Sequence, residues 1–426
     1  MKHKSFVLLV FSAILLAFFC SQIFIGPVAA QSGRKTTNDS SDKKKKDMES
    51  PDTTKPTQTT QSADSNTGQS QQGPAGGLSG KPPLKKGADP TIKGSDQDTL
   101  ELGTNIVNVS VVVYDKKSGK IYTGLKKDNF KIFEDGVEQK LTNFSAGDAP
   151  ITNVVCLEFS KLTDRLGGDP FEYGRAEVLR PTLAFIREFV KPQDYVSIVA
   201  YDIRPTTISD FTNDPAKLMH AVSLLFANSP AFSEANLYDA LKFVLKGGRG
   251  DAEVLGKNSD KDSEDYVGLE EVEGRTSILL LTSGIDTFSK INYDEARKIV
   301  ENAGVPVYII GTGNLFFKKY EDQLPTTQRM TMLQAQNALR TFADSSGGAY
   351  FPVTFEGEIN STLANINAMM RSEYSLGYVP TNTRAEGKRR KIDVHVFIEG
   401  VDRTKELVVQ HRMSYIEPKP NNGKKK

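Results

Sequence analysis

The chain has 426 residues and a formal net charge of +1 at pH 7, from 54 lysines and arginines and 53 aspartates and glutamates. This balance excludes the broad positive charge that is typical of nucleic-acid-binding proteins, so we expect no nucleic-acid partner. The length allows two or three folded domains of about 100–200 residues each. A hydrophobic content of 38% indicates that part of the chain does not fold at all.

Residues 1–30 are typical of a signal peptide. A short basic start at residues 2–4 precedes an apolar run from residue 6 to residue 25, and residues 28–30 supply the small side chains that a signal peptidase needs. We expect cleavage after Ala30 and a secreted, periplasmic or cell-envelope location. The alternative is an uncleaved N-terminal anchor, because the apolar run approaches the ~20 residues that span a bilayer. Contact with a membrane would then occur only through that anchor.

The chain contains two cysteines, and Cys20 lies inside the predicted signal peptide. Cys156 therefore has no partner, and we expect the exported domain to fold without disulfides. Because Cys156 lies in an apolar run, we predict a buried structural thiol and not a nucleophile.

Residues 31–98 form a low-complexity tract of Ser, Thr, Asp, Lys, Gln, Gly and Pro. Few of these side chains can be buried, so folding would cost conformational entropy without a compensating gain. We predict a disordered linker over this whole tract.

Residues 99–150 form a β-rich segment. In the stretch 106–113, apolar residues recur partly with a period of two residues, and a turn is predicted over 116–119. A second hairpin is predicted at 134–136, where Asp-Gly supplies the positive φ angles of a tight turn. This segment is too short to bury a core by itself.

Residues 151–356 show an alternating pattern of strands and helices. Short, nearly continuous apolar runs predict strands at 154–159, 195–201, 277–282, 305–310 and 349–352. Such runs are typical of a parallel sheet that is covered on both faces. Helices are predicted at 173–189, 215–226, 237–245, 293–302, within 328–342, and at 358–370. The fold class is therefore α/β, with a doubly wound, mostly parallel sheet.

Residues 371–417 form a second β-rich segment, with strands expected at 374–379, 392–398 and 407–410. The economical interpretation is that these strands complete the sheet begun at 99–150. The α/β domain would then be inserted in a small discontinuous β-sandwich. The tail at 418–426 is basic, and we expect it to be disordered.

Three stretches at the ends of predicted strands or starts of helices carry a pattern: 154–160 (VVCLEFS), 235–241 (ANLYDAL) and 278–287 (ILLLTSGIDT). Together they resemble the von Willebrand factor A family. The flanking stretches 125–130 (LKKDNF) and 374–378 (YSLGY) are similar to bacterial exported proteins in which that domain is framed by β segments. The resemblance implies a Rossmann-like sheet with ligands at the carboxyl ends of its strands. It also implies an exported protein-binding role of the adhesion or scaffold type.

The family holds a divalent cation with an Asp-x-Ser-x-Ser stretch, a Thr and a second Asp, because Mg²⁺ prefers carboxylate and hydroxyl oxygens. The matching positions in this sequence are Glu158, Ser160, Ala235 and Ser283. Leu162 replaces the second Ser, and a shift to Thr163 would be needed to recover its hydroxyl. Two carboxylates have become one and a hydroxyl has become a methyl group. We therefore predict a degenerate metal site and no cofactor, with weak Mg²⁺ binding as the alternative.

The resemblance also places a partner-binding face at Glu158, Ser160, Asn236, Ser283 and Asp286. We expect a protein partner, whose identity the sequence does not encode. Ser160 and Ser283 are alternatively strand-end groups that bond to loop amides, and Asp286 is alternatively an N-cap. A purely structural envelope module is the alternative function.

The long acidic loop at 247–275 lacks the Gly and Glu spacing of a calcium loop, and we expect it to be solvated and mobile. The four histidines lie in unrelated segments, and the sequence contains no nucleophile elbow or metalloprotease His-Glu pair. We therefore expect no enzymatic activity.

Overall fold

The computed structural model describes residues 81–85, 106–147, 149–166, 174–248, 265–355, 357–382, 387–402 and 406–417. The predicted signal peptide, the tail at 418–426 and the predicted linker apart from 81–85 lie outside these residues. All described residues belong to one compact unit, Pro74–Lys426. Within them, no helix is both long and apolar enough to cross a bilayer.

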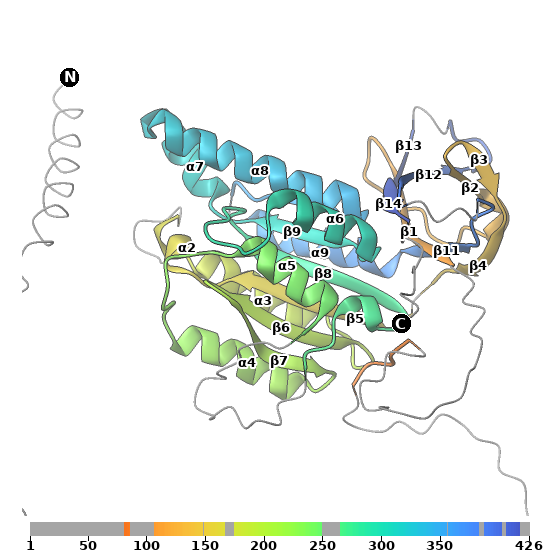
Figure 1. Cartoon of the computed structure of the whole chain (residues 1–426). Coiled ribbons are helices and arrows are strands. Elements are labelled where there is room, and N and C mark those ends of the chain that lie inside the picture. Colours follow the sequence, from red (N-terminus) through yellow and green to blue (C-terminus); the bar gives the residue numbers. More distant parts are fainter. Residues whose placement is uncertain are drawn as a thin grey trace, which may run out of the picture. The chain divides into compact units, whose positions relative to one another are not determined.

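A six-stranded sheet forms the centre of the α/β domain, with strand order β10-β9-β8-β5-β6-β7 (Figure 1). Its strands are β5 (Ile151–Glu158), β6 (Tyr195–Tyr201), β7 (Pro205–Thr212), β8 (Arg275–Thr282), β9 (Val307–Gly311) and β10 (Tyr350–Pro352). All neighbours pair in parallel except β6 and β7, which are antiparallel. From β5 the chain first adds β6 on one side and later β8 on the other. This confirms the prediction of a mostly parallel sheet in an α/β fold.

Two details of this sheet differ from the sequence-based prediction. β7 was not predicted, because most of its residues are polar and only half-buried at the sheet edge. β5 begins three residues earlier than expected. The polar residues Thr152 and Asn153 precede the apolar run, but both are buried within the strand. The Nδ2 atom of Asn153 donates to Ser277 Oγ at 2.9 Å, so a hydrogen bond between neighbouring strands offsets its burial.

Helices cover both faces of this sheet. On β5, Val154 and Cys156 belong to one buried cluster, and Val155 and Leu157 belong to the other. The first face is covered by α5 (Leu237–Lys246), α6 (Tyr293–Ala303) and α8 (Thr326–Ser346), the second by α3 (Ala176–Glu188), α4 (Pro215–Ala227) and α9 (Glu358–Arg371). Burial raises the pKa of the Cys156 thiol, as expected for a structural cysteine.

Two four-stranded antiparallel sheets are built from the segments before and after the α/β domain. Their strand orders are β13-β1-β11-β4 and β14-β12-β2-β3. The strands are β1 (Val107–Asp115), β2 (Phe130–Glu134), β3 (Val137–Gln139), β4 (Leu141–Ser145), β11 (Tyr374–Tyr378), β12 (Arg389–Val396), β13 (Leu407–His411) and β14 (Ser414–Ile416). β1 pairs with β11 and β13, and β2 pairs with β12, so each sheet combines strands from both sides of the α/β domain. Apolar side chains of both sheets form one buried cluster.

The turn between β2 and β3 confirms the predicted Asp-Gly hairpin. Asp135 and Gly136 have φ angles of 50° and 83°. These left-handed angles match the right-handed twist of the strands that the turn joins. Short helices complete the described elements: η1 (Lys127–Asn129), α2 (Lys161–Arg165), η2 (Leu269–Glu271), α7 (Asn314–Tyr320) and η3 (Glu321–Gln323).

The predicted disorder of 31–98 is wrong at residues 81–85, which pack on the α/β domain. Leu84 forms an antiparallel bridge with Val272, and the Lys85 N–H donates to the Glu271 carbonyl at 2.9 Å. Pro82 is buried, and Leu84 packs against the buried cluster under α5 and α6. The burial of these two apolar side chains stabilises this short stretch on the domain.

The described end of the acidic loop is also more ordered than predicted. Residues 249–264 lie outside the described part of the chain, but Tyr266, Leu269 and Val272 are all buried. Tyr266 stacks on Phe243 of α5, with ring centroids 4.7 Å apart. The expectation of a solvated loop is therefore wrong from 265 to 275, because apolar residues between the acidic ones are buried against α5.

Candidate functional site

The carboxyl ends of β5 and β8 lie side by side, because the two strands pair in parallel register. Glu158 is the last residue of β5, and Thr282 is the last residue of β8. Ser160 is the N-cap of α2, and its Oγ accepts from the Thr163 N–H at 3.3 Å. The short helix α2 therefore brings a second hydroxyl, that of Thr163, to the same edge of the sheet.

The Glu158 carboxylate accepts five hydrogen bonds. Its Oε1 accepts from Ser160 Oγ at 3.1 Å and from Thr163 Oγ1 at 2.9 Å. Its Oε2 accepts from Thr282 Oγ1 at 3.0 Å, and from the N–H and Oγ of Ser283, both at 2.8 Å. All five residues are buried, and Glu158 has no exposed surface (0%). We call this group the Glu158 cluster.

The five donors of the Glu158 cluster are all uncharged. A buried carboxylate is stable only when hydrogen bonds or opposite charges replace its lost hydration, and here four hydroxyls and one amide do so. A cation could bind the same carboxylate only if some hydroxyl protons turned away from it. Tyr201 continues the network, with its hydroxyl 2.6 Å from Thr282 Oγ1. Burial and the nearby Glu158 charge raise the pKa of Tyr201, so its hydroxyl stays protonated.

The structure brings together Glu158, Ser160 and Ser283, as the resemblance implied. Thr163 joins them, so the hydroxyl that Leu162 cannot supply comes from the next position. The spacing Glu158, Ser160, Thr163 was the sequence signal for this residue. Thr282 was not predicted, because it stands at the end of an apolar run and carries no pattern of its own.

Ala235 and Asn236 take no part in the hydrogen bonds of the Glu158 cluster. The Ala235 side chain lies in the buried cluster under α5. Asn236 is 3% exposed, and its Nδ2 donates to the carbonyls of Ile203 at 2.7 Å and Phe288 at 3.1 Å. Asn236 therefore links the loop after β6 to the loop after β8.

Asp286 holds the start of α5. Its Oδ1 accepts from the Tyr238 N–H at 3.2 Å and from Ser289 Oγ at 2.5 Å. The helix that it caps is α5, which precedes it in the chain, and not the segment that follows. Burial raises the pKa of the Asp286 carboxyl.

The described part of the chain offers few ligands for a metal ion. No group of three or more His, Cys, Asp and Glu side chains there is arranged to hold a metal ion. In the Glu158 cluster, one carboxylate stands with four hydroxyls, so the only anionic oxygens that the cluster offers are those of Glu158.

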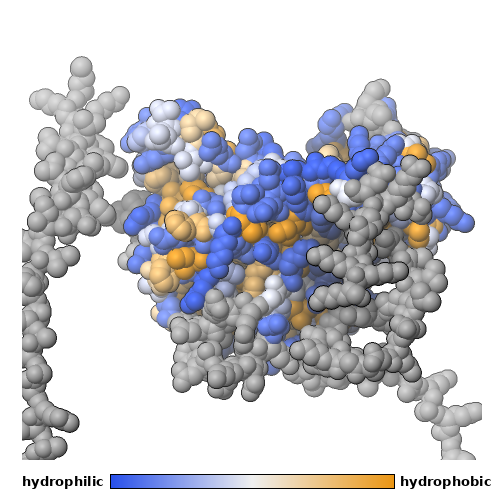
Figure 2. All heavy atoms as spheres, viewed as in Figure 1, coloured by the Kyte–Doolittle hydropathy of each residue, from blue (hydrophilic) through white to orange (hydrophobic). Residues whose placement is uncertain are grey.

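Exposed apolar side chains surround the carboxyl edge of the sheet. Ile203 follows β6, Phe232 precedes α5 and Phe288 follows β8, and they are 39%, 44% and 74% exposed. In Figure 2, hydrophobic residues reach the surface around the end of the domain where α2 and α7 lie in Figure 1. The edge therefore offers apolar surface beside a sealed carboxylate.

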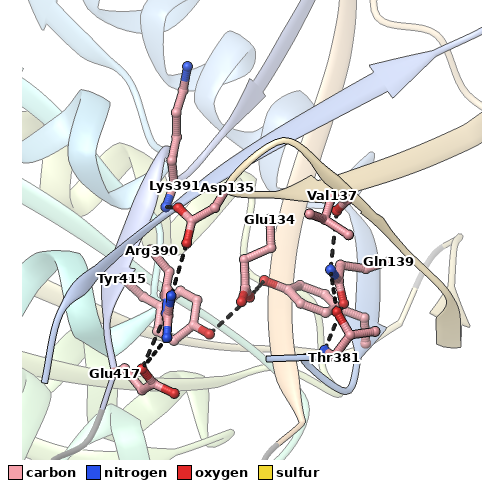
Figure 3. A network of polar contacts seen from close by, with 10 residues as sticks. Glu134, Asp135, Val137, Gln139, Thr381, Arg390, Lys391, Tyr415 and Glu417 are labelled. Carbon is pink, nitrogen blue, oxygen red and sulfur yellow. Dashed lines mark hydrogen bonds and ion pairs between the residues drawn. The ribbon is translucent and has the colours of Figure 1, made fainter. Parts of the chain in front are cut away.

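A second buried carboxylate, Glu134, lies between the two antiparallel sheets (Figure 3). Its Oε2 accepts from the hydroxyls of Tyr378 at 2.7 Å and Tyr415 at 3.0 Å. Beside it, Arg390 pairs with Asp135 at 3.2 Å and with Glu417 at 2.8 Å. Because Glu134 and Tyr378 belong to different sheets, this network joins the sheets, and we assign it a structural role.

Similarity to known proteins is confined to solved structures. No protein-family model matches the chain, and no curated protein matches it. Solved structures with similarity include a serine-substituted variant of an aerotolerance-related membrane protein from Bacteroides fragilis, with 16% identity over 52% of this chain and 98% of that chain and a TM-score of 0.35.

Two more solved structures show similarity of the same order. The conserved hypothetical protein BatB from Bacteroides thetaiotaomicron has 16% identity over 52% of this chain and 100% of that chain, with a TM-score of 0.32. The vWF domain of the type V pili tip protein Mfa5 from Porphyromonas gingivalis has 12% identity over 52% of this chain and 95% of that chain, with a TM-score of 0.32. With TM-scores of this size, these similarities by themselves assign no function.

Proposed function

We propose that this chain is an exported protein-binding module of the von Willebrand factor A type, with an adhesion or scaffold role. A signal peptide at 1–30 directs it to a secreted, periplasmic or cell-envelope location. The α/β domain is inserted in a β-sandwich made by the two antiparallel sheets. The loops at the carboxyl edge of the central sheet hold a protein partner without a metal ion or another cofactor.

The hydrogen bonding of Glu158 is the observation that carries this proposal. The carboxylate occupies the edge where the family holds its cation, but both of its oxygens already accept hydrogen bonds from the protein. At the position of the family's second carboxylate, this chain has Ser283, whose hydroxyl donates to Glu158. Hard cations depend strongly on the number of anionic ligands, so this exchange favours a metal-independent mode of binding.

The candidate nucleophiles support a role other than catalysis. Cys156 is buried and its pKa is raised, which keeps it a neutral thiol. The hydroxyls of Ser160 and Ser283 donate to Glu158, and among the described residues neither is hydrogen-bonded to a histidine that could act as its base. A non-enzymatic role therefore agrees with the protonation and burial of these groups.

Calorimetric titration with MgCl₂ and with MnCl₂ tests the metal-independent proposal. We expect no saturable heat from the wild-type chain. The variant Glu158→Asp/Ala235→Thr/Ser283→Asp restores three of the family's ligand types and keeps Thr163 as the nearby hydroxyl, and we expect it to gain saturable binding. Saturable binding by the wild-type chain that is abolished by Glu158→Ala would show that the site is a weak Mg²⁺ site.

A purely structural envelope module is the alternative function. The exposure of Ile203, Phe232 and Phe288 favours binding, because a face without a ligand gains nothing from exposed apolar side chains.

Activity profiling against esters, peptides and glycans is expected to give no turnover. Turnover that Ser160→Ala or Ser283→Ala removes would contradict the non-enzymatic assignment.

A further inference from the structure

We infer that Ile203, Phe232 and Phe288 form a contact surface for an uncharged segment of a partner protein that carries aromatic or aliphatic side chains. We call these three residues the apolar loop surface. This inference rests on the binding role proposed above and specifies the chemistry of the partner.

The apolar loop surface is exposed although its residues are large and apolar. Phe288 is 74% exposed, Phe232 44% and Ile203 39%. Each stands on a different loop, and all three loops lie at the carboxyl edge of the central sheet. Single exposed apolar residues are common on protein surfaces, but a group on adjoining loops is typical of a contact site.

Hydrogen bonds hold the backbone of these loops in place. Asn236 Nδ2 donates to the carbonyls of Ile203 and Phe288, and the Asn236 N–H donates to the Asp202 carbonyl at 2.8 Å. The carbonyl of Phe232 accepts from the Lys161 N–H at 2.7 Å. The exposed side chains are therefore carried by a connected backbone. A surface that is already arranged in this way loses less conformational entropy on binding.

Charge balance favours an uncharged partner segment. The start of α2 and the described loops 202–204, 228–236 and 283–290 together carry three basic and three acidic side chains, namely Lys161, Arg204, Lys290, Asp202, Glu234 and Asp286. Such a surface does not select a charged partner by electrostatic complementarity. The acidic side chains also disfavour an anionic membrane surface, which attracts segments that are purely basic. Glu158 is buried and both of its oxygens accept hydrogen bonds, so we expect no bound cation that could bridge the surface to an acidic side chain of the partner.

Selection from a random linear peptide library on phage, with the full chain as the target, tests this inference. We expect enrichment of uncharged peptides with aromatic or aliphatic residues, and binding that EDTA does not change. The variant Ile203→Ser/Phe232→Ser/Phe288→Ser is expected to weaken the selected peptides by at least about tenfold. The matched control Val137→Ser/Met413→Ser removes apolar side chains that are 57% and 63% exposed elsewhere, and we expect unchanged affinity. Thermal unfolding of both variants shows that they fold.

The other outcomes overturn the inference in distinguishable ways. Peptides that bind the triple variant as well as the wild type, but lose affinity on Arg204→Glu or Lys290→Glu, would refute the apolar loop surface and leave the proposed binding function intact. Acidic peptides that require Mg²⁺ would refute both. Failure of any peptide to enrich would also count against both. Self-association in sedimentation that only the triple variant loses would assign the surface to a second copy of the chain. Binding to vesicles of phosphatidylcholine and phosphatidylglycerol that only the triple variant loses would assign it to a membrane.

Discussion

The two edges of the central sheet compensate buried charge in different ways. At the amino edge, Asp194 forms an ion pair with Arg371 and also accepts the Ile151 N–H at 3.0 Å. Nearby, Arg275 donates to the carbonyls of Arg371 and Glu373. At the carboxyl edge, the Glu158 carboxylate is surrounded by uncharged donors. The buried carboxylate at the amino edge therefore has a cationic partner, whereas the one at the carboxyl edge has only uncharged donors.

This difference follows from what lies beyond each edge. Arg371 is the last residue of α9, and Glu373 lies between α9 and β11. The contacts of Asp194 and Arg275 at the amino edge therefore fix the central sheet to the end of α9 and to the link that leads into the antiparallel sheets. The carboxyl edge carries loops with exposed apolar side chains. Neutral donors stabilise Glu158 there without placing a charge at the surface. One edge serves attachment within the chain, and we propose that the other serves contact with a partner.

The largest expected effect comes from removing the carboxylate of the Glu158 cluster. Glu158→Ala leaves four hydroxyls and one amide without their acceptor, and we expect a loss of about 3–5 kcal/mol in the free energy of unfolding. Urea denaturation measures this loss. Glu138 is an exposed glutamate, and Glu138→Ala is the control, with an expected change within about 0.5 kcal/mol. Equal stability of the two variants would show that the hydrogen bonds of Glu158 contribute little.

The amino edge is tested by breaking its ion pair. Arg371→Met leaves the buried Asp194 charge without its cation, and we expect a loss of about 3 kcal/mol in the free energy of unfolding. The control Arg329→Met breaks an exposed pair with Glu321, whose expected contribution is less than about 1 kcal/mol. Denaturation at low and high salt separates them, because salt screens the exposed pair more strongly. A loss for Arg371→Met no larger than the control would contradict the proposed ionic attachment.

A smaller effect concerns pH. Burial raises the pKa of the Glu373 carboxyl from 4.5 to about 7, while Arg275 and a hydrogen bond from Ser110 partly oppose that change. The folded chain therefore keeps a proton that the unfolded chain loses, so this group stabilises the fold fully below pH 4.5. That contribution is lost as the pH rises through about 7. We expect roughly 3 kcal/mol of pH-dependent stability from this group.

Glu373→Gln is expected to remove this dependence. The amide does not titrate, so the variant should lose less stability than the wild type between pH 4.5 and pH 8. Thermal unfolding at a series of pH values measures the two slopes. Parallel slopes would show that Glu373 titrates at its ordinary pKa.

Much of the fold was predictable, because its signals are local. Continuous apolar runs identified β6 and β8, and Asp214 with Pro215 marked the start of α4. Asp135 and Gly136 formed the expected turn. β7 and α2 escaped prediction for the opposite reason: one is a polar edge strand, and the other has five residues, which is too short for a helical period.

The sequence by itself determined the alternation of strands and helices, the burial of Cys156 and the residue types at Glu158, Ala235 and Ser283. These depend on residue type and on spacing along the chain. The tertiary structure alone decided that Thr282 and Thr163 seal Glu158, that Asn236 joins two loops and that residues 81–85 pack on the α/β domain. These contacts join residues far apart in the chain or depend on the direction of a side chain. A hydrogen bond needs its donor and acceptor within about 3 Å, and only the folded chain sets that distance.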